Sequence, residues 1–145
     1  EGILYYYLEE RKPSDDVTAN FNVVYVNERQ LAALLGGRFD PSTVNVDDIY
    51  EKEMMKLEAL TRGTVSKEYV TIDGIKSAKY INTFRATVPT EESPEGKELV
   101  FRTAGILTYV PRLKALYVFT CTDNEKDYLT SSEIFNNVIS SIRFL

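Results

Sequence analysis

The sequence contains no histidine, no tryptophan and only one cysteine. Without histidine there can be neither a Ser-His-Asp nor a Cys-His arrangement for nucleophilic catalysis, and the usual imidazole acid–base group is missing as well. One cysteine without histidine also leaves no ligand set for a structural zinc ion. The cysteine itself, Cys121, lies in an apolar stretch, which predicts an inert buried thiol rather than a reactive one. We therefore predict that the chain is not an enzyme, and we predict no catalytic residues and no cofactor.

The chain also lacks basic runs and long hydrophobic runs. Its net charge is −5 over 145 residues, which argues against nucleic acid or an anionic membrane surface as a partner. No segment approaches the roughly 18 consecutive apolar residues that a membrane-spanning helix needs. A hydrophobic content of 43% and a charged content of 27% are typical of a globular protein, so we expect residues 1–145 to form a single domain.

The first residue is Glu1 rather than methionine, which indicates a processed or trimmed chain. Removal of a secretory signal peptide would explain this start, and so would removal of a lipoprotein leader, which would place a lipid anchor upstream. A cloned domain of a longer protein explains it equally well. The sequence leaves these origins open.

Two stretches near the N-terminus have the composition of strands. Residues 3–8 (ILYYYL) and 19–26 (ANFNVVYV) are rich in β-branched and aromatic residues, and a polar connection separates them, so they predict a hairpin. One alternative for Tyr5, Tyr6 and Tyr7 is an aromatic platform for a sugar or a peptide. Because neighbouring residues of a strand point to opposite faces, at most two of these rings share a surface, and a place in the core is favoured.

Two helices are expected next. Asn27, with Gln30 three residues later, can cap a short helix that ends at Gly36-Gly37. The two glycines also suit a phosphate-binding loop, but neither a G-x-G-x-x-G pattern nor a following Lys-Ser/Thr pair is present, so a helix stop is favoured. Residues 47–61 predict a second, longer helix, because their apolar side chains recur at helical spacing.

A second hairpin is predicted in the middle of the chain. Residues 65–72 and 75–88 have strand character, and Asp73-Gly74 between them favours a type I′ turn because glycine tolerates a positive φ. The acidic loop at 89–97 contains two prolines and follows the second strand.

The last third of the chain predicts two strands and a closing helix. Residues 98–109 form the first strand, which Pro111 ends, and residues 115–122 form the second. The second has apolar residues on both faces, as expected of a central strand covered on two sides. Thr130-Ser-Ser-Glu133 has the spacing of a capping box and predicts the start of the helix. The apolar stripe expected behind it consists of Ile134, Phe135, Val138, Ile139 and Ile142.

Three groups of charged residues are candidates for chemistry. Asp47, Asp48 and Glu51 cluster in the first turn of the longer predicted helix, where the helix dipole and the orphan amides stabilise carboxylates without any ligand. A hard-cation site is the alternative, although Ca²⁺ requires six or more oxygen ligands and no EF-hand spacing is present.

The other two groups are also explained by their local structure. Three acidic residues of the loop at 89–97 are expected to be solvated charges: Glu91, Glu92 and Glu95. Arg112 and Lys114 are expected at a hairpin tip, with an acidic partner as the alternative. We predict no catalytic, cofactor-binding or metal-binding residues among these groups.

Several stretches of the sequence resemble the PsbP/Mog-like fold family, which includes the extrinsic photosystem subunit PsbP, the Ran-binding Mog proteins and bacterial envelope proteins of the DcrB type. The matching stretches are 70–80 (VTIDGIKSAKY), 107–109 (LTY), 116–122 (LYVFTCT) and 134–144 (IFNNVISSIRF). The sequence departs from the family in having no N-terminal hairpin with an apolar YP-x-x-W-like stretch, and no histidine where PsbP-type metal binding would use one. The resemblance therefore implies a fold and a non-enzymatic character, and it carries over no functional residues.

The resemblance and the element order together predict an α+β fold. We expect an antiparallel sheet of about six strands with helices packed on its faces, which is the α/β/α sandwich of the PsbP/Mog-like family. The resemblance also implies an extracytoplasmic bacterial protein, either secreted or anchored as a processed lipoprotein.

The leading functional hypothesis is a non-catalytic binding or accessory domain with a protein partner. The alternative is a metal- or small-ligand-binding domain that uses the carboxylates of Asp47, Asp48 and Glu51 or the loop from Glu91 to Glu95. A weaker third hypothesis is a hydrolase with two carboxylates roughly 5 to 10 Å apart, but the sequence offers no pair that we can place in this way.

Overall fold

The structure is a computed structural model of the chain, and it describes residues 3–7, 19–37, 40, 44–61 and 64–145. Side chains are described for all of these residues except 3–7, 57–58, 60–61 and 64–65. In this part of the chain, six strands form one sheet in the order β1-β2-β6-β5-β4-β3, and every neighbouring pair is antiparallel. The strands are β1 (Ile3–Tyr7), β2 (Asn20–Val26), β3 (Thr64–Ile72), β4 (Ile75–Val88), β5 (Lys97–Val110) and β6 (Ala115–Asn124).

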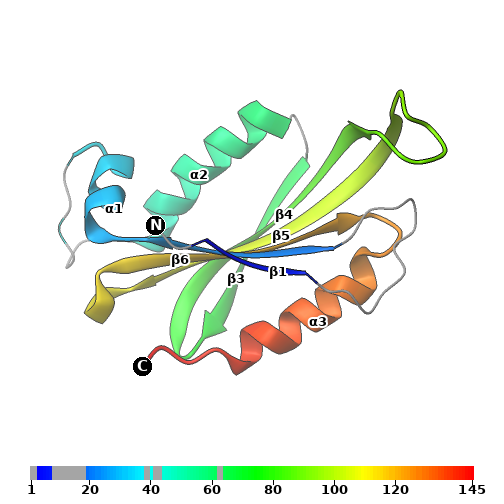
Figure 1. Ribbon diagram of the computed structural model, residues 1–145. Coiled ribbons are helices and arrows are strands. Elements are labelled where there is room, and N and C mark those ends of the chain that lie inside the picture. Colours follow the sequence, from blue (N-terminus) through cyan, green and yellow to red (C-terminus); the bar gives the residue numbers. More distant parts are fainter. Residues whose placement is uncertain (1–2, 8–18, 38–39, 41–43, 62–63) are drawn as a thin grey trace.

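Within the described residues, three α-helices cover the two faces of this sheet (Figure 1). The helices α1 (Glu28–Leu34) and α2 (Val46–Thr61) lie on one face, and α3 (Tyr128–Ser141) lies on the other. The predicted α+β class, with an antiparallel sheet between layers of helices, is therefore confirmed, and the described sheet has six strands.

The turns follow the local sequence signals. Asp73 and Gly74 have φ angles of 48° and 78°, as a type I′ turn requires, and they join β3 to β4. Asn27 and Gln30 form the predicted capping box of α1, with both reciprocal hydrogen bonds at 3.0 Å. Pro111 ends β5 and opens the 3₁₀ turn η2 (Pro111–Leu113) before β6. Short-range chemistry thus sets these element boundaries.

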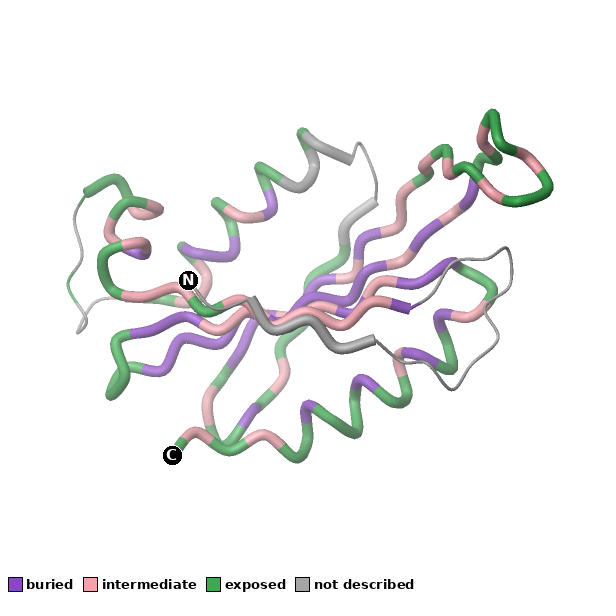
Figure 2. Tube along the Cα trace, in the orientation of Figure 1, coloured by how far each residue is buried: buried purple, intermediate pink, exposed green. Residues whose placement is uncertain are grey.

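Each face of the sheet has its own hydrophobic cluster. The cluster under α1 and α2 includes Leu31, Ile49, Leu107 and Leu116, and each of these side chains is at most 1% exposed. The cluster under α3 contains residues such as Ile106, Phe119 and Phe135. Buried positions alternate between the two clusters along β5 and β6, and Figure 2 shows these strands buried over most of their length. The prediction of a central strand covered on two sides is confirmed for β6.

The predicted capping box at the start of the last helix is wrong. The helix α3 begins at Tyr128, with Asp127 at the N-cap, so Thr130 and Glu133 lie inside the helix. Asn124 sets this earlier start, because its side-chain oxygen accepts the backbone N–H of Asp127 at 3.1 Å while its amide donates to the Asp127 carboxylate at 2.8 Å. This turn directly follows β6 and leaves no room for a separate loop.

The predicted apolar stripe of α3 is correct only in part. Phe135 and Ile139 are buried, but Ile134 and Val138 are 38% and 50% exposed. The line of α3 that faces the sheet consists of Tyr128, Ser131, Phe135 and Ile139. The helix is turned in this way because Phe135 stacks on Phe21 of β2 and Ser131 reaches a buried carboxylate at the end of β6. Ile134 and Val138 consequently lie on the flank of the helix.

Candidate functional site

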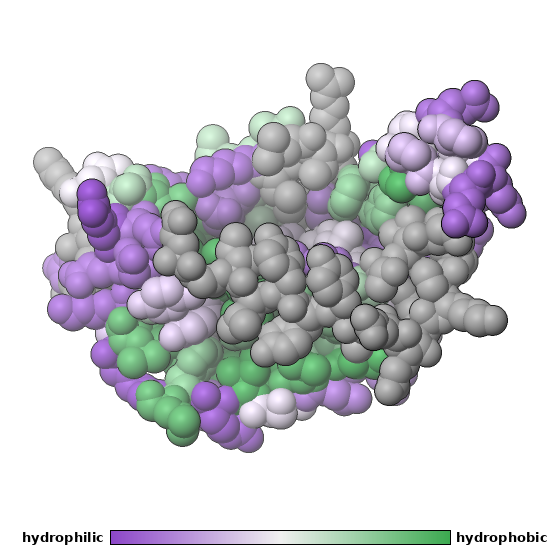
Figure 3. All heavy atoms as spheres, in the orientation of Figure 1, coloured by the Kyte–Doolittle hydropathy of each residue, from purple (hydrophilic) through white to green (hydrophobic). Residues whose placement is uncertain are grey.

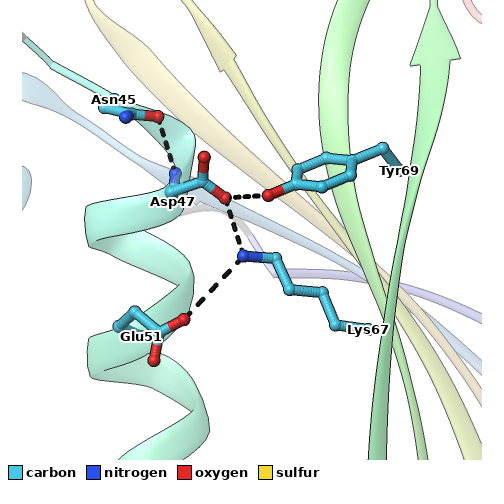
Figure 4. A network of polar contacts seen from close by, with 5 residues as sticks. All are labelled: Asn45, Asp47, Glu51, Lys67 and Tyr69. Atoms are coloured by element: carbon cyan, nitrogen blue, oxygen red, sulfur yellow. Dashed lines mark hydrogen bonds and ion pairs between the residues drawn. The ribbon is translucent and has the colours of Figure 1, made fainter.

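The acidic start of α2 is held by residues of β3, the strand at one edge of the sheet (Figure 4). Asn45 accepts the backbone N–H of Asp47 at 2.9 Å and so satisfies one of the orphan donors of the helix. Lys67 donates to the Asp47 carboxylate at 2.7 Å, and the hydroxyl of Tyr69 donates to the same oxygen. Glu51, one turn further along α2, lies 3.8 Å from the Lys67 ammonium. The Lys67 ammonium thus bridges Asp47 and Glu51, two of the three carboxylates that are clustered in the sequence.

The electrostatic surroundings of Lys67 favour its charged form. Its ammonium lies 4.3 Å from the centre of the Tyr50 ring and 5.0 Å from that of Tyr69. The hydrogen bond to Asp47 raises the pKa of Lys67, and the bond to Tyr69 adds to this effect. The same hydrogen bond from Lys67, followed by the one from Tyr69, lowers the pKa of Asp47 below 3.8. The pair is therefore ionised throughout the neutral range.

Asp48, the third carboxylate of this group, points to a different place. It lines an open hollow of about 470 Å³ between the C-terminal end of α1 and the first turns of α2. The other charged residues that line this hollow are Asp40, Glu51 and Lys52. The apolar residues Leu35 and Val44 also line it. The structure therefore brings Asp47 and Glu51 together around Lys67, and Glu51 also lines the hollow beside Asp48. Among the described residues, no three acidic, cysteine or histidine side chains are grouped as metal ligands.

The loop between β4 and β5 is held by backbone hydrogen bonds to the carbonyl of Ser93. The backbone N–H of Thr90 donates to the carbonyl of Ser93 at 3.0 Å, and that of Gly96 donates to the same carbonyl, also at 3.0 Å. The three acidic residues of this loop are exposed, as predicted for solvated charges: Glu91, Glu92 and Glu95.

The remaining sequence candidates also have structural surroundings. Arg112 and Lys114 are exposed at the tip of the β5–β6 hairpin, where the Lys114 ammonium lies 4.0 Å from Glu28 of α1. Cys121 is fully buried in the cluster under α3, as predicted. The ring positions of residues 5–7 lie outside the described side chains, so the aromatic-platform alternative is untested.

Gly36 and Gly37 follow Leu35, the C-cap of α1, and have positive φ angles of 82° and 83°, which is the conformation of a helix stop. The backbone N–H of Gly37 donates to the carbonyl of Ala32 at 2.7 Å, which closes the last turn of the helix. The helix stop is therefore confirmed at these two glycines.

A buried polar group at the junction of β6 and α3 was not predicted from the sequence. Asp123 is 1% exposed, and its carboxylate accepts the Ser131 hydroxyl at 2.5 Å and the backbone N–H of Asn124 at 2.8 Å. In the sequence, a charged residue at the end of a strand cannot be distinguished from a residue of an exposed loop. Only the position of Ser131 over the strand reveals its hydrogen bond to Asp123. The bond fixes α3 to the sheet.

A row of polar side chains across the α1/α2 face of the sheet was also missed. Asn20, Thr122, Thr103 and Asn82 occupy paired positions on four neighbouring strands, from β2 through β6 and β5 to β4. The hydroxyls of Thr103 and Thr122 hydrogen-bond to each other at 2.7 Å. Residues so far apart in the sequence become neighbours only through the strand register. The row lies beyond the hydrophobic cluster under α2.

The fold places this chain among α+β proteins with an antiparallel sheet between helical layers, and it has known counterparts. No family model matches the sequence, and no curated protein matches it. Among solved structures, PA94 from Pseudomonas aeruginosa, a protein of unknown function described as a candidate regulator, matches with a TM-score of 0.64 and 13% identity, over 99% of this chain and 83% of that one. LpqN of Mycobacterium tuberculosis, which is involved in cell envelope biogenesis, matches with a TM-score of 0.59 and 11% identity, over 95% of this chain and 76% of that one.

At these identities the likeness is one of fold alone. It supports the predicted architecture, and the resemblance to the PsbP/Mog-like family stays a prediction. In the part of the chain that the structure describes, none of the helices has the length and apolar character needed to cross a membrane.

Proposed function

We propose that the chain is a non-catalytic binding or accessory domain that acts through a protein partner outside the cytoplasm of a bacterial cell, either secreted or as a processed lipoprotein. The observation that carries the proposal is the structural role of two carboxylates of α2. Asp47 and Glu51 both form ion pairs with Lys67 of β3, so they hold α2 on the edge of the sheet. The fold likeness to LpqN, a protein of envelope biogenesis, supports the compartment.

A pull-down tests this proposal. The tagged domain serves as bait for separated envelope and soluble fractions of the source organism, and captured proteins are quantified against an unrelated acidic domain of the same size. We expect one protein to be enriched reproducibly from the envelope fraction and to capture the domain in the reciprocal experiment. Capture of nothing at low salt, or of the same proteins from both fractions, would count against the accessory role.

The second candidate function is the binding of a divalent cation or small ligand in the hollow beside α2. The observation that favours it is that Asp40, Asp48 and Glu51 all line that hollow. A ligand that binds only the folded state raises its stability, by about 2.7 kcal/mol at one hundred times its Kd. The test is a thermal melt with and without millimolar Ca²⁺ or Mn²⁺, repeated with Asp48→Asn as the matched control. An unchanged midpoint eliminates the cation, whereas a rise that Asp48→Asn abolishes supports it.

A further inference from the structure

The edge strand β3 has a partner on one side only. Within the described sheet it pairs with β4 alone, residue against residue from Thr64 and Thr83 to Ile72 and Ile75, so no bulge interrupts it. Its sequence, TVSKEYVTI, contains neither proline nor glycine. A proline, a bulge or a very short strand is what usually keeps a sheet edge from pairing with another chain. Because β3 uses none of these devices, its outer edge can accept a further strand.

The charged side chains of β3 leave this edge unprotected, because their partners belong to the same copy. Lys67 donates to Asp47 at 2.7 Å, and Figure 4 shows it turned toward α2. Glu68 lies opposite Lys79 of β4 and forms an ion pair with its ammonium at 3.0 Å. Both charges are thus directed over the sheet and are neutralised there. A strand that approaches from outside meets no uncompensated charge of β3.

The surface around β3 is electrically balanced, although the chain as a whole carries a net charge of −5. Three carboxylates and three ammonium groups lie on and beside the strand: Asp47, Glu51, Glu68, Lys67, Lys76 and Lys79. In a two-fold contact a surface meets itself, so an acidic surface repels its own copy whereas a balanced one does not. At the centre of this surface Tyr69 is 46% exposed, with the Lys76 ammonium 4.1 Å from its ring centre.

The exposed hydrophobic residues of α3 belong to a different surface. Figure 3, which views the molecule from the β1 side, shows hydrophobic residues gathered along α3. This helix packs on β6, and β5 and β4 lie between β6 and β3. Tyr25 of β2, which is 40% exposed, is separated from β3 by the same strands and by β6 itself. A contact at β3 therefore does not involve Tyr25 or α3.

We propose that β3 of a second copy pairs with β3 of the first, antiparallel and about a two-fold axis perpendicular to the sheet. Each β3 then provides the backbone partners that the outer edge of the other lacks. The sheets of the two copies join into one, and both α2 helices lie on the same face of it. Such a dimer forms from the chain alone, so its test is independent of the accessory role.

The charges of β3 select the register of this pairing. A two-fold axis sets one residue of β3 against the same residue of the other copy. An axis at Lys67 opposes two ammonium groups and an axis at Glu68 opposes two carboxylates, which destabilises the pair. An axis at Tyr69 opposes the two phenol rings and sets Lys67 against Thr71 of the other copy. It pairs residues 66–72 of both copies, the longest overlap of the two strands without like charges in opposition.

The oligomeric state in solution tests the dimer. Sedimentation velocity of the purified domain is measured from about 1 to 100 µM, the range in which an interface with a Kd near micromolar shifts from one copy to two. We expect the mass to rise from 16.5 kDa toward twice that value and no further, since a two-fold contact closes. Tyr69→Lys puts two ammonium groups at the axis and should weaken the dimer by about tenfold or more in Kd. Tyr25→Lys is the matched control and should dimerise like the parent chain.

Thr71 allows a test of the register that depends on the sign of a charge. It is exposed, and in the proposed register it lies against Lys67 of the other copy. Thr71→Glu should tighten the dimer and Thr71→Lys should weaken it, although both introduce a long charged side chain at the same position. Lys76 lies opposite Thr71 within one copy, so circular dichroism of dilute samples verifies that both variants are folded. Equal effects of the two substitutions contradict the register.

Cysteine cross-linking measures the register directly. The native Cys121 is fully buried, so an introduced surface cysteine is the one thiol that reacts in the folded chain. Two Tyr69→Cys thiols meet at the axis, whereas two thiols of Ser66→Cys lie about 20 Å apart along the paired strands. Mild oxidation should therefore join two copies of Tyr69→Cys and leave Ser66→Cys monomeric.

A parent chain that stays monomeric up to the highest concentration overturns the proposal, including the case in which a strand of a partner protein occupies β3 instead. Growth beyond two copies overturns the two-fold arrangement. Equal weakening by Tyr69→Lys and Tyr25→Lys, or cross-linking of Ser66→Cys in preference to Tyr69→Cys, shows that the contact lies elsewhere.

Discussion

The residue type at position 105 of the sheet is constrained by the side chain of a neighbouring residue, Tyr80. The two residues occupy paired positions on β5 and β4, and the Tyr80 ring lies over the glycine. A Cβ atom at position 105 would lie 2.1 Å from Cζ of this ring, far inside van der Waals contact. The ring is in turn buried, with 7% of Tyr80 exposed. Glycine is needed here for space.

We expect Gly105→Ala to destabilise the protein by about 1–3 kcal/mol, because the buried ring has to move to admit a methyl group. Urea unfolding followed by circular dichroism measures the loss. In a chain that already carries Tyr80→Leu, the same alanine substitution should cost much less, since the ring is gone. An equal cost in both backgrounds would mean that the clash with Tyr80 is not the cause.

Tyr80 also makes the stability depend on alkaline pH. Burial raises the pKa of its phenol from 10.0 to about 12, with smaller contributions from Glu53 and Tyr50. Between these values the unfolded chain loses the proton while the folded chain keeps it, so the free energy of unfolding falls as the pH rises from 10 to 12.

The Tyr80→Phe variant should lack this component of the decline. Two pKa units correspond to at most about 2–3 kcal/mol, and about half of this, roughly 1.4 kcal/mol, is the expected narrowing of the stability difference between parent and variant from pH 9 to pH 11. Chemical unfolding at pH 9 and at pH 11 gives the comparison, and parallel curves for the two proteins would contradict the assignment. The phenols of Tyr109 and Tyr128, whose pKa is also raised by burial, are present in both proteins and cancel.

At the scale of elements, the start of α3 allows a local sequence signal, the capping box, to be compared with a tertiary contact. The capping-box residue Thr130 is exposed within the first turn, whereas the neighbouring Ser131 is buried against Asp123 of β6. Removing a buried hydrogen-bond partner costs about 1–3 kcal/mol, while an exposed hydroxyl contributes little. We therefore expect Ser131→Ala to lower stability by this amount and Thr130→Ala to change it by under about 0.5 kcal/mol.

Thermal and urea unfolding of the two alanine variants measure the contrast. The two positions are adjacent in one helix and lose the same hydroxyl group, so helix propensity alone predicts nearly equal effects. A larger loss of stability for Thr130→Ala than for Ser131→Ala would mean that the capping box, and not the contact with Asp123, anchors the helix.

The contact of α2 with the edge strand β3 is the second feature at this scale. Asp47 and Lys67 are about one third exposed, so their ion pair is screened by water and should contribute under about 1 kcal/mol. A double-mutant cycle of Asp47→Asn and Lys67→Met measures the coupling directly.

The contribution of the Asp47 pair should depend on pH in a defined direction. Because the folded pKa of Asp47 is lowered, its stabilisation is present above about 3.8 and is lost as the pH falls below that value. The difference in stability between the parent chain and Asp47→Asn should therefore shrink in acid. A difference that persists at pH 2 would indicate that Asp47 acts through something other than its charge.

At the scale of the whole molecule, two hydrophobic clusters share one sheet. Met54 of α2 packs in one cluster and Ile139 of α3 packs in the other, while β5 and β6 contribute side chains to both. Loss of either cluster removes the support of the same central strands, so we expect the described domain to unfold in a single step.

Core truncation on each face tests this coupling. Met54→Ala and Ile139→Ala should each cost about 2–5 kcal/mol and shift the whole transition. Far-ultraviolet circular dichroism, which reports the backbone, and tyrosine fluorescence should then give one midpoint for each variant. Separate midpoints in either variant would show that one helical layer unfolds without the other.

Local patterns predicted most of the elements because each of them depends on a few neighbouring residues. Asn27 with Gln30, Asp73-Gly74 and Pro111 act within four residues of themselves, and each lies where its pattern indicated. The apolar residues on both faces of β6 were sufficient to predict that the strand is covered on two sides, since burial on two sides leaves no polar face. The α+β class follows from the order of these elements.

What the sequence could not determine depends on partners far away in the chain. Asp47 alone resembles a helix-start carboxylate or a metal ligand, and only the placement of β3 brings Lys67 and Tyr69 to it. The rotation of α3 was likewise settled by Phe21 and Asp123, which leave Ile134 and Val138 at the surface. Hydrophobic periodicity predicts that a helix has an apolar side, but the arc that is buried depends on the width and the contacts of the opposing sheet. The sequence by itself therefore determined the elements and their order, whereas the tertiary structure decided which charges meet and which hydrophobic surface stays exposed, because these result from packing between distant segments.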